Sequence, residues 1–331
     1  MNFFQFGGKL ALAGVLTLVA GLTQAQAAPE LTIKAAHAAS TTNTGHKALE
    51  MMDLELRART DGRIGMEIFP NGQLGGEREL IESIQLGNID MVFVSSAPLA
   101  SFNKKFFALD MPFLFKDRAS VYKVLDGDIG QELLASLESV GIEGLGYWEN
   151  GFRQLTNNSR VIRTADDLSG LRMRTMENQI HLAIWQELGA NPAPLAFNEL
   201  YTALQQGTFE AQEGPINLFR DMRFDEVQKF ISKTNHIYSP FVVLMNPEVH
   251  SRMSKEDKVI FNEIFQEAKV YQRDLAQKAD SEAAASLKGV TITTLTPEEL
   301  STFSSQMKPV YDQIKDIVGA DFGDRVIQAA Q

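Results

Sequence analysis

Two arginines stand where a guanidinium group would suit an anionic ligand. Arg153 ends the segment Trp148-Glu149-Asn150-Gly151-Phe152-Arg153, a predicted strand end with an aromatic, glycine-containing turn. Arg174 lies on the polar side of an alternating strand that runs from Leu171 to Met176. In a closed cleft an arginine matches a carboxylate bidentately, and each charge-assisted hydrogen bond is worth roughly 1.5–3 kcal/mol. The pair predicts a site for one anion, and the alternative is two surface cations lying over aromatic neighbours.

Motifs of catalysis and metal binding are missing from the sequence. There is no G-x-S-x-G, no Walker loop, no G-x-G-x-x-G after a strand, and no cysteine. The five histidines form no H-x-x-x-H pair, and Asp126, Asp128 and Gly130 only imitate the start of a calcium loop. We therefore expect no catalytic residue, no cofactor and no metal site, although co-binding of a cation with the ligand stays open.

The net charge and the N-terminal segment predict a protein that lies outside the cytoplasm and does not bind nucleic acid. The net charge of −11 offers no basic field for a phosphate backbone. Lys9 is followed by the apolar run Leu10–Leu22 and by small residues up to Ala27, which is typical of a secretory signal peptide over residues 1–27. The run is too short for a membrane span, which needs about 20 residues. We predict an exported, periplasmic protein cut after Ala27.

The elements that would position the arginines are those of an α/β fold. Apolar periodicity predicts strand, helix, strand, helix and strand over residues 31–35, 46–59, 64–68, 77–86 and 90–94. Such β-α units place ligands at loops and helix starts beside the strand ends. Further along, the pattern predicts strands at 141–148 and 241–245, a helix face over 180–188, and a helix from Ser254 to about Leu287. That last helix is on the order of 50 Å long, enough to lie across two domains.

Several separated motifs together resemble the periplasmic receptors of TRAP transporters, the DctP-type solute receptors. They are Arg174–Asn178, Leu188–Pro192 and Pro194–Gly207, with further likeness at Gly72–Gly75, Trp148–Asn157, Glu226–Phe230 and Thr234–His236. The likeness extends over nearly the whole chain after the signal peptide. It implies a two-lobed α/β binding protein of type II-like form, with a long helix crossing both lobes and a ligand between them. We assign residues 28–150 and 240–279 to one lobe and residues 151–239 and 280–331 to the other.

The resemblance also implies roles for three residues of the site. Arg174 matches the family arginine that forms the main salt bridge with the ligand carboxylate, and Arg153 matches a second arginine that reaches the same ligand. Phe197 matches the aromatic residue that packs near that bridge. At Gly214 the family often has an asparagine that helps to hold the carboxylate. Asn217 or a water is our candidate to replace it.

Other polar residues are expected to contact the rest of the ligand. The sialic-acid receptors of the family have a Glu and an Arg near the stretch that here reads Ser95-Ser96-Ala97-Pro98, so sialic acid is disfavoured. The serines Ser95 and Ser96 suit the hydroxyl groups of a smaller acid. The remaining candidate contacts are His37, Glu77, Asn150 and His236. Alternatively, Glu77 caps its helix and His37 is a hydrogen-bonded histidine at a strand end.

These observations lead to one main hypothesis and three alternatives. The protein is expected to bind an organic acid, such as a uronate or aldonate, and to deliver it as a monomer to the sodium-coupled TRAP permease. A C4-dicarboxylate or 2-oxo acid is the alternative ligand. An alternative of another class is a periplasmic hydrolase or lyase that uses Glu77 or His236 on an acidic sugar. A sensor domain that signals to a membrane kinase would share the fold.

Overall fold

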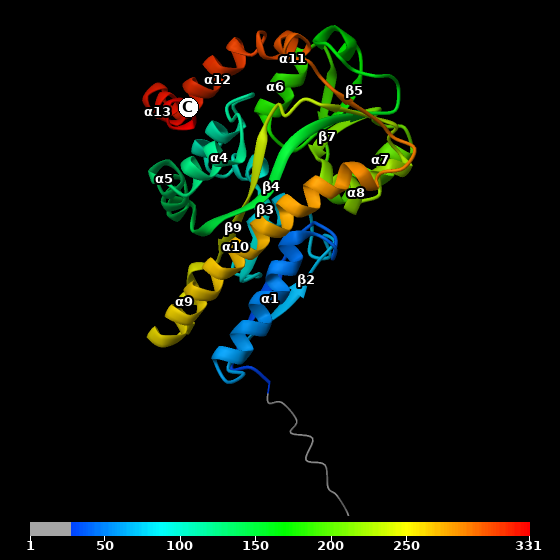
Figure 1. Ribbon diagram of the computed structural model, residues 1–331. Helices are drawn as coiled ribbons and strands as arrows, with labels where there is room; N and C mark the ends of the chain where they lie inside the picture. Colours follow the sequence, from blue (N-terminus) through cyan, green and yellow to red (C-terminus); the bar gives the residue numbers. More distant parts are fainter. Residues whose placement is uncertain (1–27) are drawn as a thin grey trace, which may run out of the picture.

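The computed structural model describes residues 28–331, so the predicted signal peptide, residues 1–27, lies outside the described residues. The described residues fold into a mixed α/β structure with ten strands (Figure 1). The strands are β1 (Leu31–Ala36), β2 (Ile64–Phe69), β3 (Met91–Ser95), β4 (Glu143–Asn157), β5 (Arg172–Thr175), β6 (Asn191–Pro194), β7 (Ala211–Pro215), β8 (Phe230–Lys233), β9 (Tyr238–Met245) and β10 (Thr291–Thr294). They follow the order β2-β1-β3-β9-β4-β7-β5-β6, while β8 pairs with β4 and β10.

Helices cover the sheet and connect its strands. The α-helices are α1 (Thr44–Arg59), α2 (Glu77–Gln85), α3 (Ser96–Leu99), α4 (Arg118–Leu125), α5 (Asp128–Ser136), α6 (Gln179–Glu187), α7 (Leu200–Gln205), α8 (Ile216–Asp221), α9 (Pro247–Arg252), α10 (Lys255–Ser286), α11 (Pro297–Ser304), α12 (Lys308–Val318) and α13 (Ala320–Ala330). Short 3₁₀ turns are η1 (Lys104–Asp110), η2 (Leu137–Val140), η3 (Ala165–Leu168), η4 (Phe197–Glu199) and η5 (Phe224–Glu226). Within residues 28–331, no helix is both long and apolar enough to span a bilayer.

The first five predicted elements are confirmed as β1, α1, β2, α2 and β3. Strand β1 pairs in parallel with both β2 and β3, as β-α-β units require. Helix α1 begins at an Asn43 cap whose side chain accepts a hydrogen bond from the backbone N–H of Gly45. Its buried face, which includes Leu49, Met52 and Leu56, packs in one core cluster with strand residues such as Ile33. The periodic spacing of the apolar residues therefore determines how these elements pack against one another.

The long strand β4 joins the two halves of the sheet. Residues Glu143–Phe152 pair with β9, and residues Arg153–Asn157 pair with β7. Near the end of the part that pairs with β9, the register shifts at a bulge between Glu149 and Gly151, and the φ of 129° at Gly151 lies in a region that favours glycine. The bulge bends the strand in the middle of the sheet. Asn150 is the extra residue of this bulge, and Arg153 begins the part that pairs with β7, so one strand supplies polar groups to both halves.

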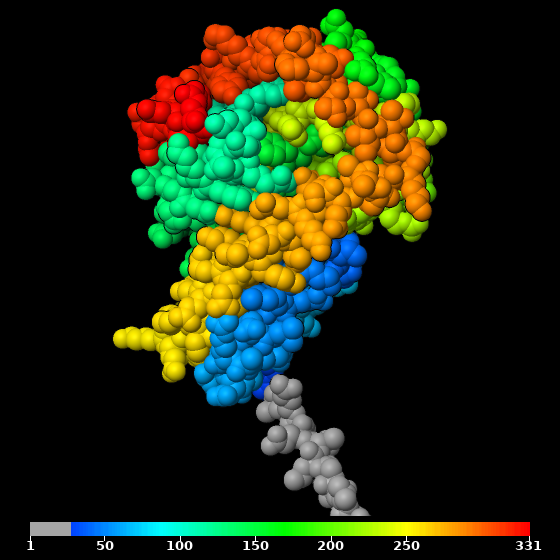
Figure 2. Space-filling model, in the orientation of Figure 1, coloured from blue at the N-terminus to red at the C-terminus, as the bar shows by residue number. Residues whose placement is uncertain are grey.

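Helix α10 runs across the molecule and contacts both regions (Figure 1). Its 32 residues begin at Lys255, directly after the capping residue Ser254, whose side chain accepts a hydrogen bond from the Asp257 N–H, so the predicted start is confirmed. It packs against α1 and β4 and, further along, against α8. The lower part of Figure 2 consists of the N-terminal segment, drawn in blue, and of α9 and the start of α10, drawn in yellow and gold.

The C-terminal helices, which belong to the predicted second lobe, pack on elements of the predicted first lobe. Helix α12 packs on η1, and α13 packs on α4 and α5 (Figure 1). The prediction assigned α12 and α13 to the second lobe, and η1, α4 and α5 to the first. The two-lobe division itself stays a prediction, with these contacts lying across its boundary.

Candidate functional site

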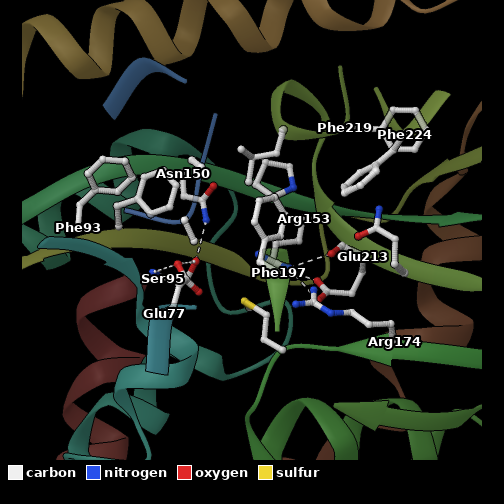
Figure 3. Close-up of a pocket in the computed structure, with 18 residues that line it drawn as sticks. Glu77, Phe93, Ser95, Asn150, Arg153, Arg174, Phe197, Glu213, Phe219 and Phe224 are labelled. Carbon is white, nitrogen blue, oxygen red and sulfur yellow. Dashed lines mark hydrogen bonds and ion pairs between the residues drawn. The ribbon is translucent and has the colours of Figure 1, made fainter. Parts of the chain in front are cut away.

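A cavity lies where strands β3, β4, β5 and β7 approach the start of α2 and the turn η4 (Figure 3). Its polar lining comes from both halves of the sheet, with Glu77 and Ser95 from the first half and Arg174 and Glu213 from the second. Asn150 and Arg153 come from the strand that joins them. The cavity thus brings together polar groups that are far apart in sequence.

Arg174 is a buried cation whose end groups have no partner among the described residues. The side chain is 2% exposed, and its Nε donates to the backbone oxygen of Leu195 at 2.8 Å. Within residues 28–331, its two Nη groups take part in no hydrogen bond or ion pair. Burial lowers the pKa of Arg174 to about 10, against the attraction of Glu213, so the group stays charged at neutral pH. A buried charge without a partner is costly, so this group favours an anionic ligand.

Arg153 differs because its charge is already paired. Its Nε and Nη2 donate to the two carboxylate oxygens of Glu213, with 2.8 Å between Nη2 and Oε1. Burial disfavours a charged Glu213, but the Arg153 guanidinium holds the pKa of that carboxyl well below its usual range. Both side chains are buried. Arg153 therefore adds hydrogen-bond donors to the site but little net charge, leaving Arg174 as the unneutralised cation of the pair.

The other end of the cavity is a polar group formed by Glu77, Ser95 and Asn150 (Figure 3). The Oε1 atom of Glu77 accepts from the Ser95 backbone N–H at 2.7 Å and from Ser95 Oγ at 2.9 Å. Burial raises the pKa of Glu77, against these two hydrogen bonds. Asn150 Nδ2 lies 3.4 Å from Ser95 Oγ, and among the described residues Asn150 Oδ1 has no partner. These groups are suited to hydroxyl groups rather than to a second anion.

Aromatic side chains form the walls between the two ends. Phe93 packs on Phe241 with 4.8 Å between ring centroids. On the opposite side, Phe224 lies 6.2 Å from Phe197 and 6.0 Å from Phe219. All five rings line the cavity. Such walls exclude water and strengthen the electrostatic interactions at Arg174.

The structure brings together most of the predicted site residues. Those that line the cavity are Glu77, Ser95, Asn150, Arg153, Arg174, Phe197 and Gly214. Neither arginine is a surface cation, because Arg153 is only 3% and Arg174 only 2% exposed. The expectation that Glu77 stands at the start of its helix also holds, since it is the first residue of α2.

Four predicted residues are buried outside the cavity lining. His37 stacks on Phe93 at 4.5 Å, and His236 lies behind the cavity with its Nε2 at 3.2 Å from Glu213 Oε2. The Asn217 side chain accepts from the Leu218 N–H at 2.7 Å, and Ser96 begins the short helix α3. None of the four is among the residues that line the cavity, so their contact with the ligand stays a prediction.

Sequence reasoning missed Glu213 and most of the aromatic wall. Glu213 reaches Arg153 only because β4 and β7 pair in antiparallel register, with Leu155 opposite Glu213. Phe219, Phe224 and Phe241 read as ordinary core positions in the sequence. The one signal that could have indicated Glu213 is its position beside Gly214, where the family often has an asparagine that helps to hold the carboxylate.

Fold and cavity together define a binding protein for a small anionic solute. Residues 35–316 match the family model of bacterial extracellular solute-binding proteins, family 7 (DctP). The chain belongs to this family, the periplasmic solute-binding proteins of TRAP systems. Members bind solutes and are not enzymes, so the hydrolase or lyase alternative is wrong.

Relatives of known ligand show what similar chains bind. The 2,3-diketo-L-gulonate-binding periplasmic protein of Escherichia coli K12 is 36% identical over 282 residues, 85% of each chain. A receptor from Polaromonas sp. JS666 bound to D-erythronate is 36% identical with a TM-score of 0.86, over 90% of this chain and 98% of that one. A receptor from Sulfurospirillum deleyianum with bound succinate is 32% identical with a TM-score of 0.85, over 92% of this chain and 100% of that one. Similar chains thus bind both sugar acids and dicarboxylates.

Proposed function

We propose that this protein is the receptor of a TRAP transporter for a sugar acid, which it delivers to a sodium-coupled membrane permease. The ligand carboxylate binds the Nη groups of Arg174, and its hydroxyl groups bind Glu77, Ser95 and Asn150. Arg153 and Phe197 complete the carboxylate end. A C4-dicarboxylate or a 2-oxo acid is the alternative ligand. Closure of the two predicted lobes over the ligand would remove the ion pair from water and make it selective.

The single observation that supports this proposal best is the unpaired charge of Arg174. Its Nε is fixed by the Leu195 carbonyl, so the two Nη groups are held in one orientation at the cavity. A carboxylate matches that fork with two parallel hydrogen bonds. It would also neutralise a charge that the protein leaves without a partner.

The end of the cavity away from Arg174, formed by Glu77, Ser95 and Asn150, fits a sugar acid better than a dicarboxylate. A second carboxylate reaching that end would meet the buried Glu77 carboxyl, and like charges in a site of low polarity repel strongly. Hydroxyl groups instead donate to Glu77 and accept from Asn150. The relatives that bind D-erythronate and 2,3-diketo-L-gulonate are consistent with this choice.

Titration calorimetry with D-erythronate and succinate tests both parts of the proposal. These acids have four carbons each, but succinate has a second carboxylate in place of the hydroxymethyl group and lacks the hydroxyl groups on carbons 2 and 3. We expect wild-type protein to bind D-erythronate at least ten-fold more tightly than succinate. Replacing Arg174→Ala should cost about 2–5 kcal/mol, since it removes one member of a buried charge pair.

The matched control is Arg172→Ala, in the same strand. That side chain is 54% exposed and pairs with Glu210 on the surface, so its loss should change the affinity little. Near wild-type affinity in Arg174→Ala would contradict the proposed carboxylate site. Tighter binding of succinate than of D-erythronate would leave the carboxylate site standing and select the dicarboxylate alternative.

A further inference from the structure

Gly214 lines the cavity although its backbone does not require glycine. It lies inside β7, where it pairs with Gln154 of β4 in antiparallel register. It is not among the residues of positive φ, so an L-amino acid with a side chain would adopt this conformation without strain. Glycine in a strand interior weakens the strand, and it often marks a position where a ligand approaches closely. The backbone conformation therefore does not explain the glycine, which leaves the space beside it as the possible reason.

That space is free of protein atoms at close range. A Cβ atom built on Gly214 would lie 3.6 Å from Gln212 Oε1 and 3.8 Å from Arg153 Nη2, which are ordinary contact distances. For comparison, a Cβ on Gly144 would lie 2.7 Å from a side-chain atom of Leu134, where packing excludes it. A side chain at 214 would therefore fit, and it would occupy part of the cavity next to Arg153.

The free space belongs to the carboxylate end of the site. Arg153 and Arg174 are close enough for their charges to interact, and Figure 3 shows them side by side. A ligand whose carboxylate binds Arg174 would therefore place its next carbon atom, carbon 2, near Gly214. The Arg153 atom nearest to this space, Nη2, already donates to Glu213. Nη1, on the same guanidinium carbon, makes no hydrogen bond within residues 28–331, so it is the donor left for an oxygen atom in this space.

We propose that Gly214 is a specificity-determining residue that leaves room for an oxygen substituent on carbon 2 of the ligand. This inference rests on the proposed function and narrows the ligand class to 2-hydroxy or 2-oxo acids. A side chain at position 214 would occupy the place of that substituent. Acids with an unsubstituted carbon 2 leave the space empty and lose the contact with Arg153.

The test compares D-erythronate with 3,4-dihydroxybutanoate, which lacks only the hydroxyl group on carbon 2. Calorimetry on wild-type protein should show at least a ten-fold preference for D-erythronate. In Gly214→Ala the new methyl group takes the place of the hydroxyl. The preference should then fall at least ten-fold, almost wholly through weaker binding of D-erythronate.

A melting experiment on ligand-free protein separates this role from a structural one. Because alanine suits extended backbone better than glycine, Gly214→Ala should melt at the wild-type temperature or above it. An equal loss of affinity for both acids, or no preference in the wild type, would overturn the inference while leaving the carboxylate site intact. If wild-type protein bound neither acid, the proposed ligand class would itself be wrong, and the inference would fall with it.

Discussion

At the scale of single residues, burial lowers the pKa of two basic groups around the cavity but leaves one charged and the other neutral. Arg174 keeps its charge, because even a pKa lowered to about 10 is well above neutral pH. His37 loses its charge, since burial and the neighbouring His46 lower its pKa to about 3. Its Nε2 lies 3.0 Å from His46 Nδ1, a hydrogen bond that needs at least one unprotonated ring. The ring that supports Phe93 is therefore neutral in the folded protein.

His37 should make the folded protein sensitive to acid. In the unfolded chain its pKa is near 6.5, and in the folded protein it is about 3, so protons bind the unfolded chain more tightly. The contribution of neutral His37 is complete above pH 6.5 and is lost as the pH falls toward 3. Between pH 7 and pH 4.5 the loss is about 2–3 kcal/mol.

Urea unfolding of wild-type protein and His37→Gln at these two pH values measures this contribution. The variant is expected to be less stable at pH 7 but to lose less stability on acidification. Equal losses in the two proteins would contradict the assignment, because every other titrating group is common to both.

At the scale of elements, the loop before α2 and the turn η4 meet close to the cavity. A Cβ on Gly76 would lie 2.9 Å from Glu79 Oε2, at the free end of a flexible side chain, and 3.3 Å from Asn198 Oδ1 and 3.4 Å from Ala196 Cβ. Gly76 has extended backbone, with φ of −74° and ψ of 179°, so the contact and not the conformation calls for glycine. Gly76 precedes Glu77, and Asn198 follows Phe197, so the contact adjoins two cavity residues. We call this contact of Gly76 with Ala196 and Asn198 the rim contact.

A side chain at the rim contact should loosen ligand retention. Gly76→Ser keeps a residue that favours helix starts, but its Cβ would be tight against Asn198 and Ala196, which must move by a few tenths of an ångström to accept it. Overpacking of this kind costs typically 1–3 kcal/mol, so the dissociation rate of bound D-erythronate should rise about five-fold or more. Release of radiolabelled ligand into excess unlabelled ligand measures this rate. The double variant with Asn198→Gly should recover part of the loss, and an unchanged rate in Gly76→Ser would show that the rim contact does not retain the ligand.

The elements that sequence periodicity predicted well are those that carry their own signals. Helix α10 begins at a capping serine and keeps one buried stripe, and the first β-α units alternate cleanly. Strand β6, with Pro192 and Pro194, carries no strand pattern and exists because β5 provides a parallel partner at the sheet edge. The same contrast holds for the site, where residues with a local signal could be predicted and contacts that depend on strand pairing could not. Arg153 and Arg174 could be predicted from strand ends and family likeness, whereas the pairing of Arg153 with Glu213 depends on strand register.

At the scale of the whole molecule, one hydrophobic core extends through both halves of the sheet. A single cluster unites Leu80 and Val92 of the first half with Met173 and Ile180 of the second. Gln272, in the middle of α10, accepts from the Glu149 backbone N–H at 2.7 Å and donates to its carbonyl at 2.8 Å. The same amide donates to Thr44 Oγ1 at 2.9 Å, at the start of α1. Gln272 therefore links α10, β4 and the start of α1 through the hydrogen bonds of one side chain.

This connectivity predicts cooperative unfolding. Differential scanning calorimetry of the ligand-free protein should show one transition, because the largest core cluster runs through both predicted lobes. A ligand at 100 times its dissociation constant should stabilise the folded state by about 2.7 kcal/mol and raise the temperature of that single transition. Two separate transitions, with only one of them shifted by ligand, would contradict the shared core.

The chain has two tryptophans, and each touches a side chain that lines the cavity or supports it. Trp148 lies 5.7 Å from Phe93 and stacks on Phe265 of α10, and Trp185 lies 5.0 Å from His236, the partner of Glu213. The emission of an indole group depends on nearby charges and on its packing. The protein thus contains natural fluorescent reporters at both ends of its ligand site, and its occupancy can be followed by optical titration without any added dye.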